Sequence, residues 1–106
     1  MPEPHLGELE HIVLLAVMRR GDEAYTAPIL DEIREQTGRS ISRGALYTAL
    51  DRLETKGCLR SRVGDPLPER GGRPRRYFTL TPAALRALKD SRQGLLRLWR
   101  GLESRL

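Results

Sequence analysis

Apolar positions along the chain repeat with helical spacing in four segments and with strand-like spacing in two. The first helical pattern runs from Leu6 to Met18, and its apolar side chains cover nearly the whole circumference. We therefore expect this helix to be buried on almost all sides, either at the centre of the domain or against a second subunit. Arg19 and Arg20 suit the negative end of the helix dipole, and Gly21 is expected to end the helix.

Two further helices are predicted in the first half of the chain. One begins at an N-cap at Thr26 and continues to about Thr37, where Gly38 stops it. The next is capped by Ser42 and ends at Gly57. Its predicted buried face consists of Ala45, Leu46, Ala49, Leu50 and Leu53. Two helices joined by so short a turn form a helix-turn-helix.

Two strand-like runs follow, Cys58–Val63 and Arg75–Leu80, joined by a loop that contains arginine. The expected fold class is therefore mainly α with a small β-hairpin, a winged helix-turn-helix over residues 1–80. Cys58 is the only cysteine, so it forms no internal disulfide and is expected to be a small buried hydrophobe. His5 and His11 lack the spacing of a helical metal pair, and we expect no metal site and no cofactor.

Thr81 and Pro82 are predicted to begin the last helix as N-cap and first helical residue. Beyond them apolar residues recur at alternating spacings of three and four, the pattern of a seam that packs on another helix. The seam consists of Leu85, Leu88, Arg92, Leu95, Trp99 and Leu102 and ends at Leu106. We expect residues 81–106 to form an amphipathic dimerisation helix. The alternative is packing of this helix on the first helix of its own chain.

The net charge of +5 is unevenly distributed. Residues 60–80 carry six arginines against Asp65 and Glu69, whereas residues 1–59 are net acidic. Positive charge concentrated on a hairpin is typical of a surface that meets a polyanion. Of the 19 basic residues 17 are arginine, which favours bidentate contacts to phosphate or guanine. Double-stranded DNA is therefore the expected partner.

Other classes of protein fit the sequence poorly. The longest apolar run, Ile12–Met18, has seven residues, whereas a helix needs roughly 20 to span a bilayer. The N-terminus does not resemble a secretory signal, so we expect a cytoplasmic location. No phosphate-binding loop, metal-ligand set or nucleophile–base pair indicates an enzyme, and we expect no catalytic residues. The remaining alternative is a winged helix that binds another protein without specific DNA binding, although such a module would not need a strongly basic hairpin.

Four stretches of the chain resemble the PadR family of transcriptional regulators, of the short type with a single C-terminal helix. They are Leu6–Leu14, the recognition-helix segment Ser42–Gly57, the wing segment Gly71–Phe78, and Leu80–Ala84 at the start of the last helix. Together they cover nearly the whole chain in the right order. Ala84 stands where the family usually has glycine, and Arg76 where lysine is commoner. The resemblance implies a dimeric winged-helix repressor that acts near its own promoter on a pseudo-palindromic operator.

The expected DNA contacts lie at the start of the recognition helix and on the hairpin. They are Ser40, Ser42, Arg43, Gly44, Tyr47, Thr48, Arg70, Arg73, Arg75 and Arg76. For Tyr47 the resemblance implies a phosphate contact through the hydroxyl. Arg75 and Arg76 point to opposite faces of a strand, so one of them should brace the hairpin internally. Asp51 would repel phosphates unless it pairs with Arg43 or Arg52, or accepts a hydrogen bond from a cytosine amino group.

Trp99 is the only tryptophan and lies on the predicted seam. An aromatic anchor in the dimer interface is the simpler interpretation. Some PadR-like regulators receive flat hydrophobic ligands between aromatic side chains at the dimer centre. The resemblance therefore implies a possible effector pocket at Trp99 for a small hydrophobic molecule.

Overall fold

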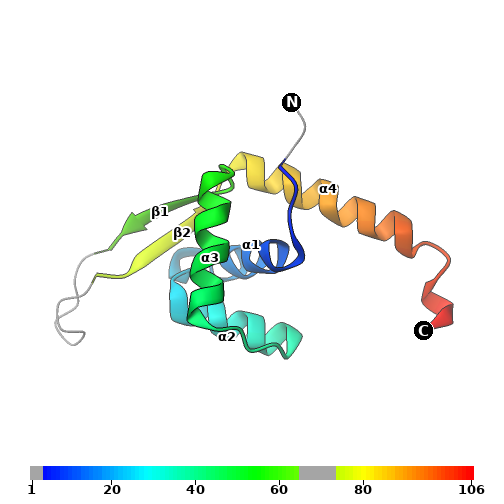
Figure 1. Cartoon of the computed structure of the whole chain (residues 1–106), viewed down its shortest axis with the longest axis horizontal. Helices are drawn as coiled ribbons and strands as arrows, with labels where there is room; N and C mark the ends of the chain where they lie inside the picture. The colour runs from blue at the N-terminus through cyan, green and yellow to red at the C-terminus, as the bar shows by residue number, and fades with distance from the viewer. Residues whose placement is uncertain (1–3, 65–73) are drawn as a thin grey trace.

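A computed structural model describes residues 4–64 and 74–106, and this part of the chain contains helices and one two-stranded antiparallel sheet (Figure 1). In chain order the elements are α1 (Glu8–Arg20), η1 (Gly21–Glu23), α2 (Thr26–Thr37), α3 (Arg43–Thr55), β1 (Leu59–Val63), β2 (Arg76–Leu80), α4 (Pro82–Trp99) and η3 (Glu103–Arg105). The expected mainly helical fold with a small hairpin is confirmed. None of the described helices is both long and apolar enough to cross a membrane.

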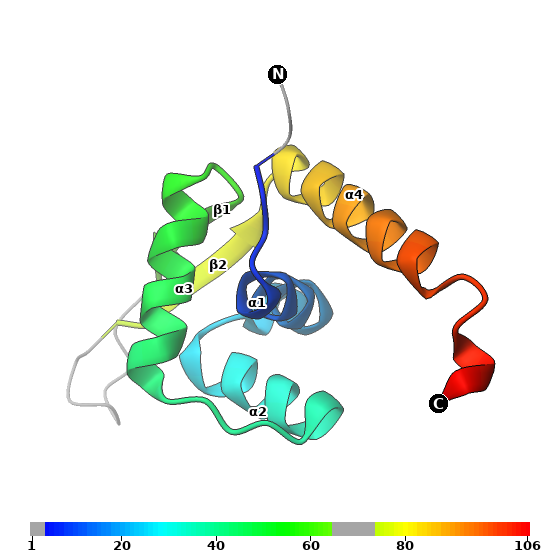
Figure 2. The same cartoon turned by 45° about the vertical axis from the view of Figure 1, so that its right-hand side comes forward.

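The first helix, α1, lies in the middle of the molecule, with α2, α3 and the hairpin around it (Figures 1 and 2). Val13 and Leu14 are completely buried. They belong to one hydrophobic core with side chains of the other elements, among them Ile29, Ile33, Leu46, Leu50, Leu53, Phe78, Ala84 and Leu88. The chain alone does not bury α1 all round, because Leu15 and Met18 are 41% and 46% exposed. Both side chains line a groove together with residues of α4.

Most predicted helix ends are confirmed by their hydrogen bonds. The Ser42 and Thr81 hydroxyls each accept a hydrogen bond from the backbone N–H three residues later, at 3.0 and 3.3 Å. Gly38 ends α2 in the left-handed conformation, with φ of 74°, which costs glycine little. The prediction of Thr26 as an N-cap was wrong by one residue, because Thr26 is already helical and Tyr25 occupies the cap position.

The last helix is shorter than expected. It ends at Trp99 instead of continuing to Leu106, and Gly101 then takes a φ of 80°, from which the chain turns into η3. Its start at Pro82 lies at the boundary predicted between residues 1–80 and 81–106. Only the first half of α4 packs on the core, through Ala84, Ala87 and Leu88. The second half therefore depends on other contacts for its apolar face.

The hairpin is attached to the body of the domain along β2. Its two strands pair from Leu59 opposite Leu80 to Val63 opposite Arg76. Phe78 is buried and its backbone N–H donates to the carbonyl of Ala24, at 2.9 Å, in the connection between α1 and α2. The hairpin thus has a fixed position relative to the helix-turn-helix, as a wing requires.

A partly buried ion pair joins the start of α1 to the end of the recognition helix. Glu10 is 8% exposed, and its Oε1 atom accepts hydrogen bonds from the Gly7 backbone N–H at 2.8 Å and from the Lys56 ammonium at 2.7 Å. Burial by itself raises the pKa of Glu10, but the hydrogen bonds from Lys56 and Gly7 and the nearby cations outweigh it. The net effect is a pKa below the ordinary value of 4.5.

The depressed pKa of Glu10 sets the sign of its contribution to stability. The folded state holds the Glu10 carboxylate ionised, so this contribution is present above about pH 4.5 and is lost as the pH falls through the folded-state pKa. We expect Lys56→Met to lower the free energy of unfolding by about 1–3 kcal/mol at neutral pH, because it leaves a buried carboxylate without its cation. Urea denaturation measures this loss. Adding Glu10→Gln should recover part of the lost free energy of unfolding and make it depend less on pH below about 4.5. Equal losses in the single and double variants would contradict the pairing.

Candidate nucleic-acid interface

The N-terminal turn of α3 presents a set of exposed polar side chains. Ser42 caps the helix and fixes where it begins. The predicted contact residues in this region are all exposed, namely Ser40, Ser42, Arg43, Gly44, Tyr47 and Thr48. The opposite face of α3 is buried through Leu46, Leu50 and Leu53. The buried face of α3 packs on the core, so its exposed face is available to a groove of DNA.

The hydroxyl of Tyr47 lies at the junction of α2 and α3. A hydrogen bond with the Thr26 side chain lowers the pKa of Tyr47, and hydrogen bonding and the positive charge of Arg43 lower it further. The ring is 46% exposed. Thr26, Arg43 and Tyr47 thus form one polar cluster that can donate several hydrogen bonds to an anion. Thr26 was not expected here, because its sequence position indicated only a helix cap.

Stacked aromatic and guanidinium groups form the base of the wing. The Arg75 guanidinium lies 4.2 Å from the centre of the Tyr25 ring, and the Tyr25 and Tyr77 rings meet edge to face at 5.5 Å. The Arg62 guanidinium lies 4.6 Å from the centre of the Tyr77 ring. Such contacts stabilise cations over aromatic faces. Arg75 therefore braces the wing against the connection between α1 and α2.

A close approach at Gly64 completes this base. Its backbone N–H donates to the Arg75 carbonyl at 2.7 Å. A Cβ atom at Gly64 would lie 2.7 Å from Cε2 of the Tyr77 ring, too close for any other residue without a shift. The sequence offered no sign that this glycine is required for packing.

Arg76 also makes contacts within the chain. Its guanidinium donates a hydrogen bond to Glu54 and lies 3.7 Å from the Asp51 carboxylate. Arg76, and not Arg43 or Arg52, is thus the partner of Asp51 in this structure. The sequence could not indicate this pair, because it joins a strand to a helix. Sequence reasoning also missed Glu54.

Two of the predicted wing contacts, Arg70 and Arg73, lie outside the described residues. Within the described part, α3 and the hairpin lie on the same side of the molecule, away from the C-terminal end of α4 (Figures 1 and 2). Among the residues that the structure describes, no group of three or more His, Cys, Asp or Glu side chains is placed to hold a metal ion.

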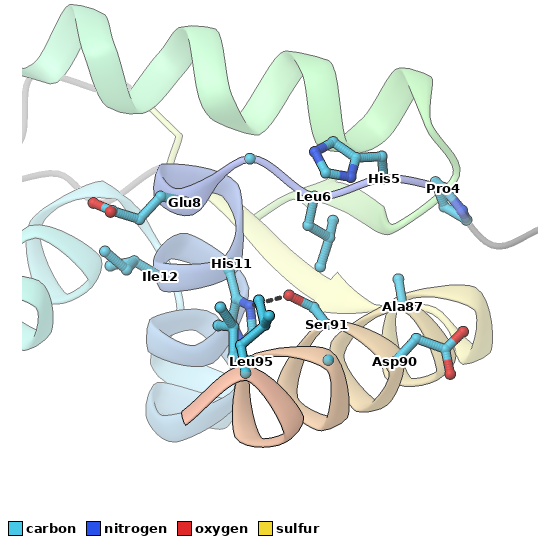
Figure 3. A pocket seen from close by; sticks show the side chains of 13 residues that line it. Pro4, His5, Leu6, Glu8, His11, Ile12, Ala87, Asp90, Ser91 and Leu95 are labelled. Carbon is cyan, nitrogen blue, oxygen red and sulfur yellow. Dashed lines mark hydrogen bonds between the residues drawn. The ribbon is translucent and has the colours of Figure 1, made fainter. Parts of the chain in front are cut away.

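A groove of about 930 Å³ separates the start of the chain and α1 from α4 (Figure 3). His11 of α1 and Ser91 of α4 point toward one another across its floor, with 2.9 Å between Nδ1 and the hydroxyl oxygen. Burial lowers the pKa of His11, which favours the neutral imidazole in this contact. The groove is lined by Leu6, Ile12, Leu95 and Leu98, among others.

A second groove of about 610 Å³ contains Trp99, Met18, Leu15 and Leu96. The side chains of the predicted dimer seam divide into two groups here. Leu88 is only 6% exposed and belongs to the core of its own chain. The remainder are exposed, namely Leu85, Arg92, Leu95, Trp99 and Leu102. The unpartnered apolar surface thus covers the second half of α4 and the adjoining side of α1.

Comparison with known proteins connects this geometry to a family. A family model described as the transcriptional regulator PadR-like family matches residues 14–90. Comparison with curated proteins found no match.

Several solved structures share the whole architecture. A transcriptional regulator from Clostridium thermocellum is 26% identical, with a TM-score of 0.73 over 91% of this chain and 90% of that chain. A PadR family regulator from Eggerthella lenta is also 26% identical, with a TM-score of 0.70 over 92% and 84% of the two chains. A PadR-like transcription factor from Bacteroides fragilis shares the fold at 21% identity, with a TM-score of 0.74 over 92% and 89%.

Proposed function

Because the chain belongs to the PadR-like family of transcriptional regulators, we propose that it is a homodimeric repressor of a pseudo-palindromic operator, released by a small hydrophobic effector. Regulation of transcription through DNA binding follows from the family itself. The observation that carries the finer proposal is the exposed N-terminal turn of α3 beside a wing that is fixed to the body of the domain.

In this proposal α3 enters the major groove with its N-terminal turn first. Small residues such as Gly44 let the backbone approach the base edges, and Arg43 can donate to guanine or to phosphate. Tyr47 and Thr26 hold a neighbouring phosphate. Ser40, Ser42 and Thr48 complete the contacts of the helix. At the wing, Arg70 and Arg73 reach the minor groove or its phosphates.

The homodimer is supported by the exposed apolar surface of α4 and α1. Leu95 and Trp99 are 52% and 42% exposed, and Leu15 and Met18 adjoin them. A continuous apolar surface of this kind is typical of a protein interface. Two copies joined along α4 would present two recognition helices to successive major grooves, about 34 Å apart. A dimer seated on its operator then blocks access to the promoter.

The effector site in this proposal is the groove at Trp99. An indole ring beside Met18, Leu15 and Leu96 offers a flat apolar surface with an adaptable thioether. Lys89 and Arg92 lie at the same groove and would favour a ligand with some negative charge. A ligand held there changes the packing of α4, on which the spacing of the two recognition helices depends.

The proposal is tested by fluorescence anisotropy with DNA from upstream of the protein's own gene and with a scrambled control, at two salt concentrations. We expect the native fragment to bind at least a hundredfold more tightly than the scrambled one, with a preference that persists at the higher salt. Equal binding to both fragments, abolished by salt, would indicate a merely basic surface. The alternative of a protein-interaction module would then be favoured.

Tyr47→Phe removes one hydroxyl from the polar cluster at the start of α3. We expect operator affinity to fall about 10- to 100-fold, because a hydrogen bond to a charged group contributes about 1.5–3 kcal/mol. The urea midpoint should remain close to that of the wild type, since the ring is half-exposed. Unchanged operator affinity would remove Tyr47 from the set of contacts.

Leu95→Asp places a charge in the middle of the exposed surface of α4. We expect sedimentation equilibrium to show a monomer where the wild type is a dimer, and operator affinity to fall by at least tenfold. Val63→Asp is a matched control, because Val63 is 68% exposed but lies on the wing. Its oligomeric state should not change. A Leu95→Asp variant that remains dimeric would place the interface elsewhere.

A further inference from the structure

Three charged side chains link the wing directly to the recognition helix. The Nη2 atom of Arg76 donates to Oε1 of Glu54, and Nη1 lies 3.7 Å from Oδ1 of Asp51. The Arg76 guanidinium also lies over the Phe78 ring, with Cζ 5.1 Å from its centre. We call this set of three residues, Arg76, Asp51 and Glu54, the wing clamp.

The wing clamp lies at a position that can set the angle of the wing. Arg76 is the first residue of β2 and is paired with Val63, the last residue of β1, so it stands where the regular hairpin gives way to the loop. Asp51 and Glu54 are one helical turn apart on the same side of α3. The contact therefore ties the outer end of the described hairpin to the C-terminal half of the recognition helix.

The same contact compensates an unfavourable charge. Asp51 follows Tyr47 by one turn on α3, and its side chain is 70% exposed. A free carboxylate there would repel the phosphates that Tyr47 and Arg43 attract. Arg76 places one positive charge against the two carboxylates and so reduces their repulsion of DNA.

We propose that Arg76 is a positioning residue of the DNA interface, which holds the wing at a fixed angle to α3 and screens Asp51 and Glu54, and that it does not itself contact a phosphate. This inference rests on the proposed DNA-binding function. The clamp is solvent-exposed, with the Arg76 side chain 45% exposed, and so it contributes little to stability. Its effect is expected in operator binding.

The two possible roles of Arg76 predict different results when its charge is exchanged with that of Glu54. A phosphate contact needs a cation at position 76, whereas a clamp needs only opposite charges on the helix and the strand. The reciprocal variant Glu54→Arg/Arg76→Glu keeps the net charge and the three side-chain types. It restores the ion pair between positions 54 and 76, and the new arginine at 54 lies one helical turn from Asp51 in place of Arg76. It also places a carboxylate where the phosphate contact would be.

The experiment measures operator affinity over a range of salt concentrations for the wild type, Arg76→Glu and the reciprocal variant. The salt slope is the steepness with which the logarithm of the affinity falls against the logarithm of the salt concentration. We expect Arg76→Glu to bind at least 30-fold more weakly, and the reciprocal variant to return to within about threefold of the wild type with an unchanged salt slope. A reciprocal variant that stays as weak as Arg76→Glu, with a slope reduced by about 0.9, would overturn the inference, because that is the slope of one lost phosphate contact.

A matched control separates the clamp from general electrostatics. Asp31→Arg/Arg76→Glu has the same net charge as the reciprocal variant, but Asp31 lies on α2, where it pairs with Arg34. We expect no recovery of affinity in this control. Recovery equal to that of the reciprocal variant would show a nonspecific charge effect and would overturn the inference.

A neutral variant, Asp51→Asn/Glu54→Gln/Arg76→Gln, keeps the inference testable if the reciprocal variant does not fold, as judged by circular dichroism. We expect the salt slope of the neutral variant to match that of the wild type. A slope lower by about 0.9 would overturn the inference. Wild-type protein that fails to distinguish the operator from scrambled DNA would refute the proposed function. If the wild type distinguishes the operator from scrambled DNA but the reciprocal variant does not recover affinity, the role of the clamp is refuted and the proposed function stands.

Discussion

Burial of α1 is the constraint on which the rest of the structure depends. Val13, Leu14 and Val17 are 0%, 0% and 2% exposed, and α2, α3, β2 and α4 all contact this helix. The described residues of the recognition helix and the wing pack on one hydrophobic core. Their relative placement therefore follows from how well they pack on α1.

Polar contacts between elements also hold α3 and the wing in place. Lys56 joins the end of α3 to Glu10 of α1, and Arg75 joins the wing to Tyr25. The first contact pairs a buried carboxylate and contributes to stability, because a buried carboxylate without a partner is costly. Exposed pairs such as Arg76 with Asp51 act mainly through geometry and charge, since solvent screens them. The interface is thus braced by several contacts of different strength.

The proposed DNA-binding surface and the proposed dimer and effector surface lie at opposite ends of the molecule. The recognition helix and wing occupy one side, whereas the exposed half of α4 extends to the other (Figure 1). α1 contacts both α3 and α4 and so lies between the two surfaces within one core. The bond between His11 and Ser91 lies at this junction. Such an arrangement suits a regulator whose dimer geometry decides whether it fits its operator.

Local chemistry in the sequence determined where most elements begin and end. Ser42, Thr81 and Gly38 act at short range, through caps and a left-handed turn, so their effect can be recognised from neighbouring residues alone. Hydrophobic periodicity likewise indicated the fold class and the exposed face of α3. The length of α4 was misjudged, because its apolar pattern continues past Gly101, where the backbone turns instead.

Only the tertiary structure decided which charged groups meet. Arg76 and Asp51 are separated by a helix end, a strand and a loop, and Tyr47 meets Thr26 across the helix-turn-helix. Pairings of this kind depend on the angles at which elements pack, and those angles come from the core as a whole. The sequence by itself determined that basic and acidic residues are present in the recognition helix and wing. Packing around α1 determined that Arg76 meets Asp51 and Glu54.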